Sequence, residues 1–338
     1  MESVDLNSKD KDKMINEIIY ILKDKLDKDY KRGKFKRGAH PKNLGLIKAN
    51  FKVDNNLDEE LRTSLIKPGI SYNCLIRFSS GGNKVKSDKS KDIRGMSIKV
   101  LGAKGKRFKN DEKNTNDFIM LTIPTMPIGT LSLFRDSIKY MVKKKNPIAY
   151  MCILIKKKKL HIVKDLMKYR KNQTSPLDVS YFSTTPYAYG NKVVKFSVVP
   201  KSTYKSEMPN RLEYNYLTNN MQSHLMNHEA KFDFLIQIRN DEKDMPINDA
   251  SVQWNENKSP FIKIGEISIP KQNFINKKRN YLSENLSFSP GNSVIDHKPL
   301  GDINLARVRI YSELSKFRHY KNKNKLVEPT IEDFNKLK

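Results

Sequence analysis

Apolar residues recur at two different spacings along this chain of 338 residues, and the spacing predicts the type of each element. Helical spacing, with an apolar residue every three or four positions, occurs at residues 9–30, 131–170 (interrupted at Pro147) and 304–319. Alternating apolar and polar positions predict strands at 71–80, 92–100, 194–198, 232–238 and 261–269. Together these elements predict an α+β fold with an antiparallel β-barrel or meander.

The two ends of the chain differ from its middle. Residues 9–30 predict one amphipathic helix, whose acidic residues, such as Asp10 and Asp24, dilute the basic face that a membrane-surface helix needs. We therefore expect residues 1–30 to form a helical segment that packs on the rest of the protein. Residues 321–338, rich in Lys and Asn, predict a loose basic tail, which leaves 31–320 as the main domain.

The chain is strongly basic, with 65 Lys and Arg against 37 Asp and Glu and a formal charge of +28. Such an excess is typical of proteins that bind nucleic acid or an anionic membrane. The lysines are spread along the whole chain, however, and no zinc-finger, leucine-zipper or aromatic RNA-binding motif accompanies them. We therefore favour solvated lysines over either partner.

The cysteines and the chain ends bear on location. Only Cys74 and Cys152 occur, which indicates neither a disulfide framework nor a cysteine metal site and suits a reducing compartment. The start lacks the order of a signal peptide, no apolar run reaches the roughly 20 residues of a membrane span, and Asn335–Lys338 is not a peroxisomal signal. We expect a soluble, intracellular and cytoplasmic protein.

The predicted helix at 304–319 carries the first candidate site. At 3.6 residues per turn, Arg307, Tyr311 and Arg318 lie on one face. Two cations beside a phenol favour its ionised form, and a phenolate is a hard ligand suited to ferric iron. The same spacing also fits a surface helix with scattered charges and a packed tyrosine.

This helix resembles the proximal helix of the catalase family, in which Arg-x-x-x-Tyr supplies the tyrosine that coordinates the haem iron. Residues 284–290 and 299–304 resemble a short catalase-related branch whose members end soon after this helix. The resemblance implies haem b as the cofactor, Tyr311 as the iron ligand, Arg307 as the residue that stabilises the phenolate, and Arg318 as a further haem-binding residue.

A histidine at the start of a predicted strand carries the second resemblance. By itself such a residue is more often structural. The segment from Arg37 to Gly45, however, matches the catalase pattern Arg-x-x-His-Ala-x-Gly-x-Gly in its Arg, its His and its last Gly. The resemblance implies that His40 is the distal acid–base residue and that Arg37 meets a haem propionate. Pro41 is shared with the short branch, whereas Asn43 departs from the pattern.

The strand at 71–80 places Arg77 and Ser79 on one face and its apolar residues on the other. Its Arg-Phe-Ser run resembles the catalase strand in which Arg meets a propionate and Ser hydrogen-bonds the distal His. A hydroxyl on one ring nitrogen fixes the tautomer and leaves the other nitrogen free to take a proton. The strand at 92–100 matches the family's Asp-x-Arg-Gly-x-x-x-Lys pattern.

The segment around Pro124 departs from the family. Aligned on this proline, either Leu121 or Thr122 stands where catalases have an asparagine that hydrogen-bonds peroxide. Leu121 offers no polar group, and Thr122, which offers a hydroxyl, is the catalytic candidate. Loss of one preorganised donor lowers rates on the order of 10²-fold. Phe134 matches an aromatic that stacks on the haem edge, and fits an ordinary core residue equally well.

One further pattern concerns metals. His224 and His228 have the i, i+4 spacing of a helical metal site, but no Glu follows the first His. We expect surface histidines there.

The resemblance covers roughly residues 31–320 and implies a catalase-like antiparallel β-barrel core with surrounding helices. It further implies a haem-dependent oxidoreductase acting on hydrogen peroxide or organic hydroperoxides, in which His40 moves a proton between the peroxide oxygens. The chain is too short for the C-terminal extension of large catalases, so we do not expect an NADPH site.

Two alternatives remain. One is a fatty-acid hydroperoxide isomerase of the allene oxide synthase type, and the other is a non-enzymatic basic binding protein on a catalase scaffold. The sequence also leaves open whether the chain forms a homo-oligomer.

Overall fold

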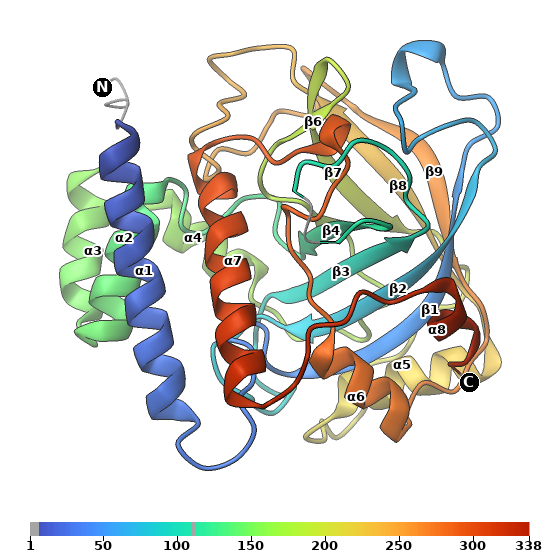
Figure 1. The fold of residues 1–338 in the computed structure, drawn as a ribbon, viewed down its shortest axis with the longest axis horizontal. Helices are drawn as coiled ribbons and strands as arrows, with labels where there is room; N and C mark the ends of the chain where they lie inside the picture. Colours follow the sequence, from blue (N-terminus) through green and yellow to red (C-terminus); the bar gives the residue numbers. More distant parts are fainter. Residues whose placement is uncertain (1–6, 110–111, 338) are drawn as a thin grey trace.

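The computed structural model describes residues 7–109 and 112–337, and an antiparallel barrel lies at its centre (Figure 1). Eight strands form the closed ring in the order β5-β4-β3-β2-β1-β9-β8-β7, which pairing of β5 with β7 closes. The strands are β1 (Asn43–Val53), β2 (Ser71–Ser80), β3 (Arg94–Leu101), β4 (Thr115–Leu121), β5 (Tyr181–Phe182), β7 (Lys192–Pro200), β8 (Ala230–Ile238) and β9 (Phe261–Ile269). A short strand, β6 (Tyr187–Tyr189), pairs with β7 outside the ring. The predicted α+β barrel is confirmed.

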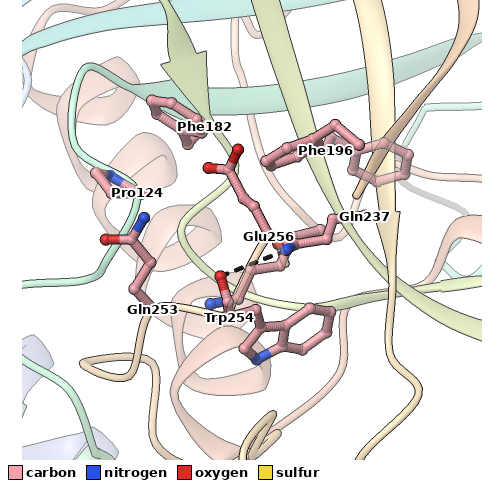
Figure 2. Close-up of a pocket in the computed structure, with 9 residues that line it drawn as sticks. Pro124, Phe182, Phe196, Gln237, Gln253, Trp254 and Glu256 are labelled. Carbon is pink, nitrogen blue, oxygen red and sulfur yellow. Dashed lines mark hydrogen bonds between the residues drawn. The ribbon is translucent and has the colours of Figure 1, made fainter. Parts of the chain in front are cut away.

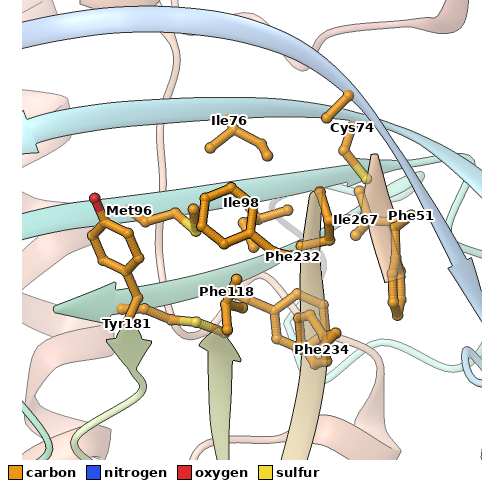
Figure 3. Close-up of a cluster of buried hydrophobic side chains, with 14 of the residues drawn as sticks. Phe51, Cys74, Ile76, Met96, Ile98, Phe118, Tyr181, Phe232, Phe234 and Ile267 are labelled. Carbon is orange, nitrogen blue, oxygen red and sulfur yellow. The ribbon is translucent and has the colours of Figure 1, made fainter. Parts of the chain in front are cut away.

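The interior of the barrel is filled by the apolar residues of the alternating pattern (Figure 3). Phe118 lies edge-on to both Phe196 and Phe234, with ring centroids 5.0 Å apart in each pair. Such edge-to-face contacts add to the free energy gained from burying the rings. Because successive side chains of a strand point to opposite faces, the residues between these positions lie on the outside of the barrel.

Helices cover the barrel in two groups. On one side lie α1 (Ser8–Asp29), α2 (Leu131–Ser137) with its π-helical continuation Ile138–Lys143, α3 (Pro147–Lys156), α4 (His161–Tyr169) and α7 (Asp302–Lys321) (Figure 1). At the lower edge in the same view lie α5 (Tyr216–Asn227), α6 (Lys277–Asn285) and α8 (Ile331–Asn335). Single 3-10 turns occur at Glu59–Leu61 and Ile295–His297. No helix in the described part of the chain is both long and apolar enough to cross a bilayer.

Helix α1 packs along α7, as expected for the amphipathic N-terminal segment. Ile15, Ile18 and Ile19 of α1 form a buried cluster with Ala306 and Ile310 of α7. Leu131 of α2 completes this cluster. The apolar face of α7 is therefore covered by helices, whereas Arg307 and Arg318 bond to Thr185 and to the Glu284 carbonyl, outside these helices.

The predicted loose tail is wrong. After α7 the chain runs back across the barrel and forms α8, which Thr330 and Asp333 cap reciprocally. Phe334 and Leu337 are buried against Leu46 of β1 and Leu75 of β2. Apolar partners on the outer faces of these strands and hydrogen bonds from Lys48 and Lys278 to the carbonyls of Leu337 and Lys336 hold the segment.

Some strand boundaries also differ from the prediction, since β7 and β8 each begin two residues earlier than their patterns indicated. Strand β3 begins at Arg94, two residues later than the pattern indicated. The Asp92 carboxylate accepts hydrogen bonds from the backbone N–H groups of Gly82 and Ile93 at 2.8 and 2.9 Å. These bonds tie Asp92 into the turn before the strand.

Candidate functional site

His40 lies just before β1 in a left-handed backbone conformation, with φ of 55°. Such a conformation is uncommon outside glycine and persists only where surrounding groups hold it. Here the His40 N–H donates to the carbonyl of Gly82 at 3.2 Å, and Arg77 donates to the His40 carbonyl at 2.9 Å. The backbone is thus held from both sides, which fixes where the imidazole points.

The imidazole rests on the outer face of the barrel. His40 Nδ1 lies 3.0 Å from Ser79 Oγ, so the predicted His–Ser contact forms. Gly95 of β3 pairs with Ser79 across the sheet, and a Cβ added to Gly95 would lie 2.7 Å from His40 Nδ1 and Cε1. Only glycine leaves room for the ring at this position, and this is the glycine of the Asp-x-Arg-Gly motif in the strand.

Burial and neighbouring cations keep His40 neutral. Burial lowers the pKa of His40 to about 3, and the charges of Arg77, Arg307, Arg37 and Arg94 act in the same direction. Near neutral pH the imidazole therefore carries one proton and offers one free lone pair. A neutral ring in a hydrogen-bonded position can accept a proton from a bound molecule.

Three arginines from distant segments meet beside His40. Arg37 donates to the carbonyls of Ser283 and Leu286, and Arg318 donates to the carbonyl of Glu284. Arg77 and Arg318 are almost completely buried. Burial and the charge of Arg37 together lower the pKa of Arg318 to about 9.

The three arginines near His40 outnumber the carboxylates that act on them. Glu284 is the carboxylate that acts on Arg37, Arg77 and Arg318. Although burial raises the pKa of this carboxyl, Arg37, Lys36 and Arg77 lower it below its ordinary value, so Glu284 is ionised. Arg37 Nη1 and Arg77 Nε are buried and have no hydrogen-bond partner among the described residues. Glu284 was missed as a site residue because nothing in its local pattern indicates that three distant arginines surround it.

Helix α7 brings the remaining predicted residues to the same region. The Arg307 guanidinium carbon lies 5.4 Å from the centre of the Tyr311 ring. Arg307 donates to Thr185 Oγ1 at 2.9 Å and to Asn304 Oδ1 at 3.2 Å, which fixes its position. Burial lowers the pKa of Arg307, but Tyr311 and Tyr187 raise it above its ordinary value. Arg307 is therefore a permanent cation beside the phenol.

The two candidates at the asparagine position lie in different places. Leu121 pairs with Gly95 across β3 and β4, so Ser79, Gly95 and Leu121 form one row across three strands. Cross-strand partners point to the same side of a sheet, which puts the Leu121 side chain on the face that carries His40. Thr122 Oγ1 instead accepts the backbone N–H of Arg94 at 3.0 Å.

Phe134, the predicted aromatic neighbour of the cofactor, lies in α2. It is partly exposed and packs against two apolar clusters, one shared by α1, α2 and α7 and the other formed by Met126, Ala250 and Ile303. The contacts of Phe134 are therefore those of a residue that packs between two apolar clusters.

The small pocket in Figure 2 is separate from this site and contains none of the residues predicted from the sequence. Lys195 lies in it 4.8 Å from the centre of the Trp254 ring and donates to the Val252 carbonyl. Burial lowers the pKa of Lys195 to about 7. Gln237 bridges the pocket wall through a hydrogen bond to the Trp254 carbonyl.

The predicted surface position of both histidines on α5 is wrong for His224. Its side chain is buried, and Nε2 lies 3.1 Å from the carbonyl oxygen of Glu229. The ring of Tyr204 packs on His224 and stacks on His228. Within the described residues no group of three potential metal ligands occurs.

Comparison with known proteins identifies the fold. Searches by sequence find no matching family model and no curated protein with a significant match. The structure, in contrast, is similar to that of a fungal catalase (TM-score 0.68, 18% identity), covering 90% of this chain and 63% of that one. This chain has a catalase-like fold.

Two further catalase structures agree with the first. Catalase A from Saccharomyces cerevisiae has a TM-score of 0.66 at 18% identity and covers 88% of this chain and 64% of that one. A bacterial catalase has a TM-score of 0.67 at 17% identity and covers 91% and 63%. This chain thus spans less than two thirds of the length of each catalase. The predicted catalase-like architecture is confirmed at the level of the fold.

Proposed function

We propose that this protein is a haem-dependent oxidoreductase that acts on hydrogen peroxide or organic hydroperoxides. The observation that carries the proposal is the buried group of Arg37, Arg77 and Arg318 around a single carboxylate, next to a neutral histidine. The catalase-like fold supports the same class of chemistry.

The arginine group fits haem. Three guanidinium groups share one ionised Glu284, which also pairs with Lys36 at 3.2 Å, so this buried region is short of negative charge, and unpaired buried charge is costly. The two propionates of haem would supply negative charge here. The unpaired Arg37 Nη1 and Arg77 Nε are donors to which such carboxylates can bind.

Tyr311 is the residue proposed to hold the iron. The Arg307 cation beside its ring stabilises a phenolate, which is the form that binds ferric iron. A haem bound here supplies a redox-active, Lewis-acidic iron at which the O–O bond of a hydroperoxide is broken. Arg307 keeps the phenolate oriented, because Thr185 and Asn304 hold its own guanidinium in place.

His40 is proposed to move the proton. The Ser79 hydroxyl lies 3.5 Å from the Gly95 carbonyl and can donate to it, so that its oxygen accepts the proton of His40 Nδ1. Nε2 is then the free lone pair and takes the hydroperoxide proton. Because burial lowers the pKa of His40, the imidazolium that forms returns its proton readily to the departing oxygen.

Leu121 favours an organic hydroperoxide over hydrogen peroxide as the substrate. An apolar side chain on the His40 face offers no hydrogen bond to a small polar peroxide but can pack against an alkyl chain. The second candidate function is therefore a fatty-acid hydroperoxide isomerase. Product analysis with a lipid hydroperoxide separates the two, since only the isomerase forms an epoxide or its ketol breakdown products.

An absorption spectrum of the protein prepared with haem tests the proposal. We expect the Soret band of a ferric phenolate complex and a clear change in it for Tyr311→Phe. Tyr320→Phe is the matched control, because Tyr320 lies on the same helix and is 80% exposed. A wild-type protein that binds no haem, or a Tyr311→Phe spectrum equal to that of wild type, would contradict the proposal. Turnover no faster than that of free haemin would favour a non-enzymatic binding protein.

A further inference from the structure

The outer face of α3 exposes a row of apolar side chains. Ile148, Met151, Cys152 and Ile155 have i, i+3, i+4, i+7 spacing and therefore share one face of the helix. Ile148 is 75% exposed and Ile155 is 55% exposed, whereas Leu154, on a neighbouring face of the helix, is buried. The helix is thus held to the protein by one apolar face and presents a second one to solvent.

The helix that follows extends this surface. Leu160, just before α4, is 48% exposed, and Met167 within α4 is 74% exposed. Ile162 of α4 is buried with Leu154 and Leu133, which fixes α4 beside α3. In Figure 1 α3 lies on the side of α1 and α2 that faces away from the barrel, and α4 is drawn between α1 and α7.

Positive charge is concentrated around these apolar residues. Residues 138–172 contain twelve lysines and arginines and a single acidic residue, Asp165. Two lysine runs, 143–145 and 156–159, lie immediately before α3 and at its end. Lys157 and Lys159 pair with Asp136 and Asp249, but no described residue forms an ion pair with the other lysines of these two runs. The even spread of lysines expected from the sequence therefore does not describe this part of the surface.

We propose that the α3–α4 face docks on the surface of an anionic lipid bilayer. Its apolar row would enter the boundary between headgroups and acyl chains, while the lysines at both ends of α3 contact anionic headgroups. Long lysine side chains suit this arrangement, because their stems lie along apolar surface while the ammonium groups stay in the headgroup layer.

The charge distribution argues against a second copy of the chain as the occupant. Joining two α3–α4 faces would bring the lysine runs of both copies together with almost no acidic residue to pair them. Like charges brought together repel, whereas an anionic bilayer supplies the missing counter-charge. Nucleic acid would satisfy the lysines, but it would leave the apolar row of α3 without an apolar partner.

Flotation with vesicles tests the proposal. We expect the protein to bind vesicles of phosphatidylcholine with 30% phosphatidylserine, and to bind pure phosphatidylcholine vesicles at least 10-fold more weakly. Ile148→Ser with Ile155→Ser should weaken binding about 10-fold. Ile275→Ser with Ile331→Ser is the control, because these residues are 48% and 47% exposed and lie outside the face.

A fluorescent label on Cys152 reports whether the apolar row enters the bilayer. Cys152 is exposed and Cys74 is buried, so a thiol-reactive environment-sensitive dye labels the α3 face. Its emission should increase and shift to shorter wavelength with phosphatidylserine vesicles, and the change should be reversed by high salt.

Three results with vesicles would overturn the proposal. They are equal binding to neutral and anionic vesicles, unchanged binding of the α3 double variant, and no change in the dye on Cys152. Sedimentation velocity without vesicles completes the test. If wild type is a dimer and the α3 double variant a monomer, a second copy is the occupant and the proposal fails. Thermal unfolding of each variant confirms that it remains folded.

Discussion

The two faces of strands β2–β4 are both buried but are stabilised in opposite ways. Toward the barrel interior lie apolar residues such as Ile76, Phe78 and Met96, which contact other apolar residues. Toward the outside the same strands carry Arg77 and Lys99, both almost completely buried. The comparison shows that burial alone does not define the core of this protein.

The two faces differ in how specific the neighbours of their side chains must be. Apolar side chains gain free energy from any apolar neighbour of suitable shape, so the inner face depends mainly on volume. Buried charges gain only if particular partners reach them, so the outer face depends on residues from other segments. Lys99, for example, needs Asp117 of β4 at 2.8 Å and Glu112 from the preceding loop. The proposed site lies on the face with the more specific requirements.

The largest loss of stability should come from truncating a large side chain in the barrel interior. Phe234→Ala removes a ring that lies within 5.0 Å of both Phe51 and Phe118. We expect a loss of about 3–5 kcal/mol in the free energy of unfolding, measured by urea denaturation. Tyr281→Ala, at a ring that is 62% exposed, should change stability by less than about 0.5 kcal/mol. A loss below about 1 kcal/mol for Phe234→Ala would mean that the barrel core is not tightly packed.

Removing a buried charge from the outer face should cost about 3 kcal/mol. Lys99→Met leaves Asp117 and Glu112 without their cation, and an uncompensated buried charge is strongly destabilising. Burial lowers the pKa of Lys99, but the two carboxylates raise it above its ordinary value, so this lysine is charged. Burial raises the pKa of Asp117 to about 7, so the loss should shrink in acid, where this carboxylate takes up a proton. A loss that is independent of pH would show that packing, not charge, is the reason.

Filling the space at Gly95 should affect catalysis more than folding, if the proposed function holds. In Gly95→Ala the new methyl group would displace the His40 imidazole. Because a catalytic group misplaced by about 1 Å can cost on the order of 10²-fold in rate, we expect a loss of that size in hydroperoxide turnover. Ser97→Ala, two residues further along the same face, is the control. Equal turnover in Gly95→Ala and wild type would exclude His40 as the proton carrier.

The smallest effect is a dependence of stability on pH that comes from His40. Its pKa is about 3 in the folded protein and 6.5 in an unfolded chain, so below pH 6.5 the unfolded state binds a proton that the folded state does not. Stability should therefore fall as the pH drops from 6.5 toward 3, by about 2 kcal/mol at pH 5.

Urea denaturation of the haem-free protein at pH 7 and pH 5 measures this term. His40→Gln should lose less stability than wild type between the two pH values. His161→Gln, at an exposed histidine, should behave like wild type. If His40→Gln and wild type lose the same amount, His40 is not held neutral in the folded state.

Much of the fold could be predicted, because local spacing reports which face of an element is apolar. Strands β2 and β9 begin and end where their alternating patterns do, and α7 includes the predicted helix. The tail was the exception. Phe334 and Leu337 are too few to form a recognisable pattern, and their burial depends on a surface that other segments provide.

The site could be predicted only in part. Arg77 and Ser79 share a face because of period two, and Arg307 and Tyr311 lie near each other because of the helical turn. The contact of His40 with Ser79 was expected from resemblance, since 39 residues separate them and no local rule joins them. No spacing could have shown that Glu284 lies among arginines.

The sequence by itself therefore determined the elements, their apolar faces and the side chains that lie within one turn or one strand of each other. The tertiary structure alone decided that Ser79, Gly95 and Leu121 form one row, because strand register sets which residues pair. It also decided that Leu121 rather than Thr122 lies on the His40 face. Backbone conformation repeats over a few residues, so the local sequence determines it. Strand register and contacts between charged residues far apart in the sequence form only when the whole chain is folded.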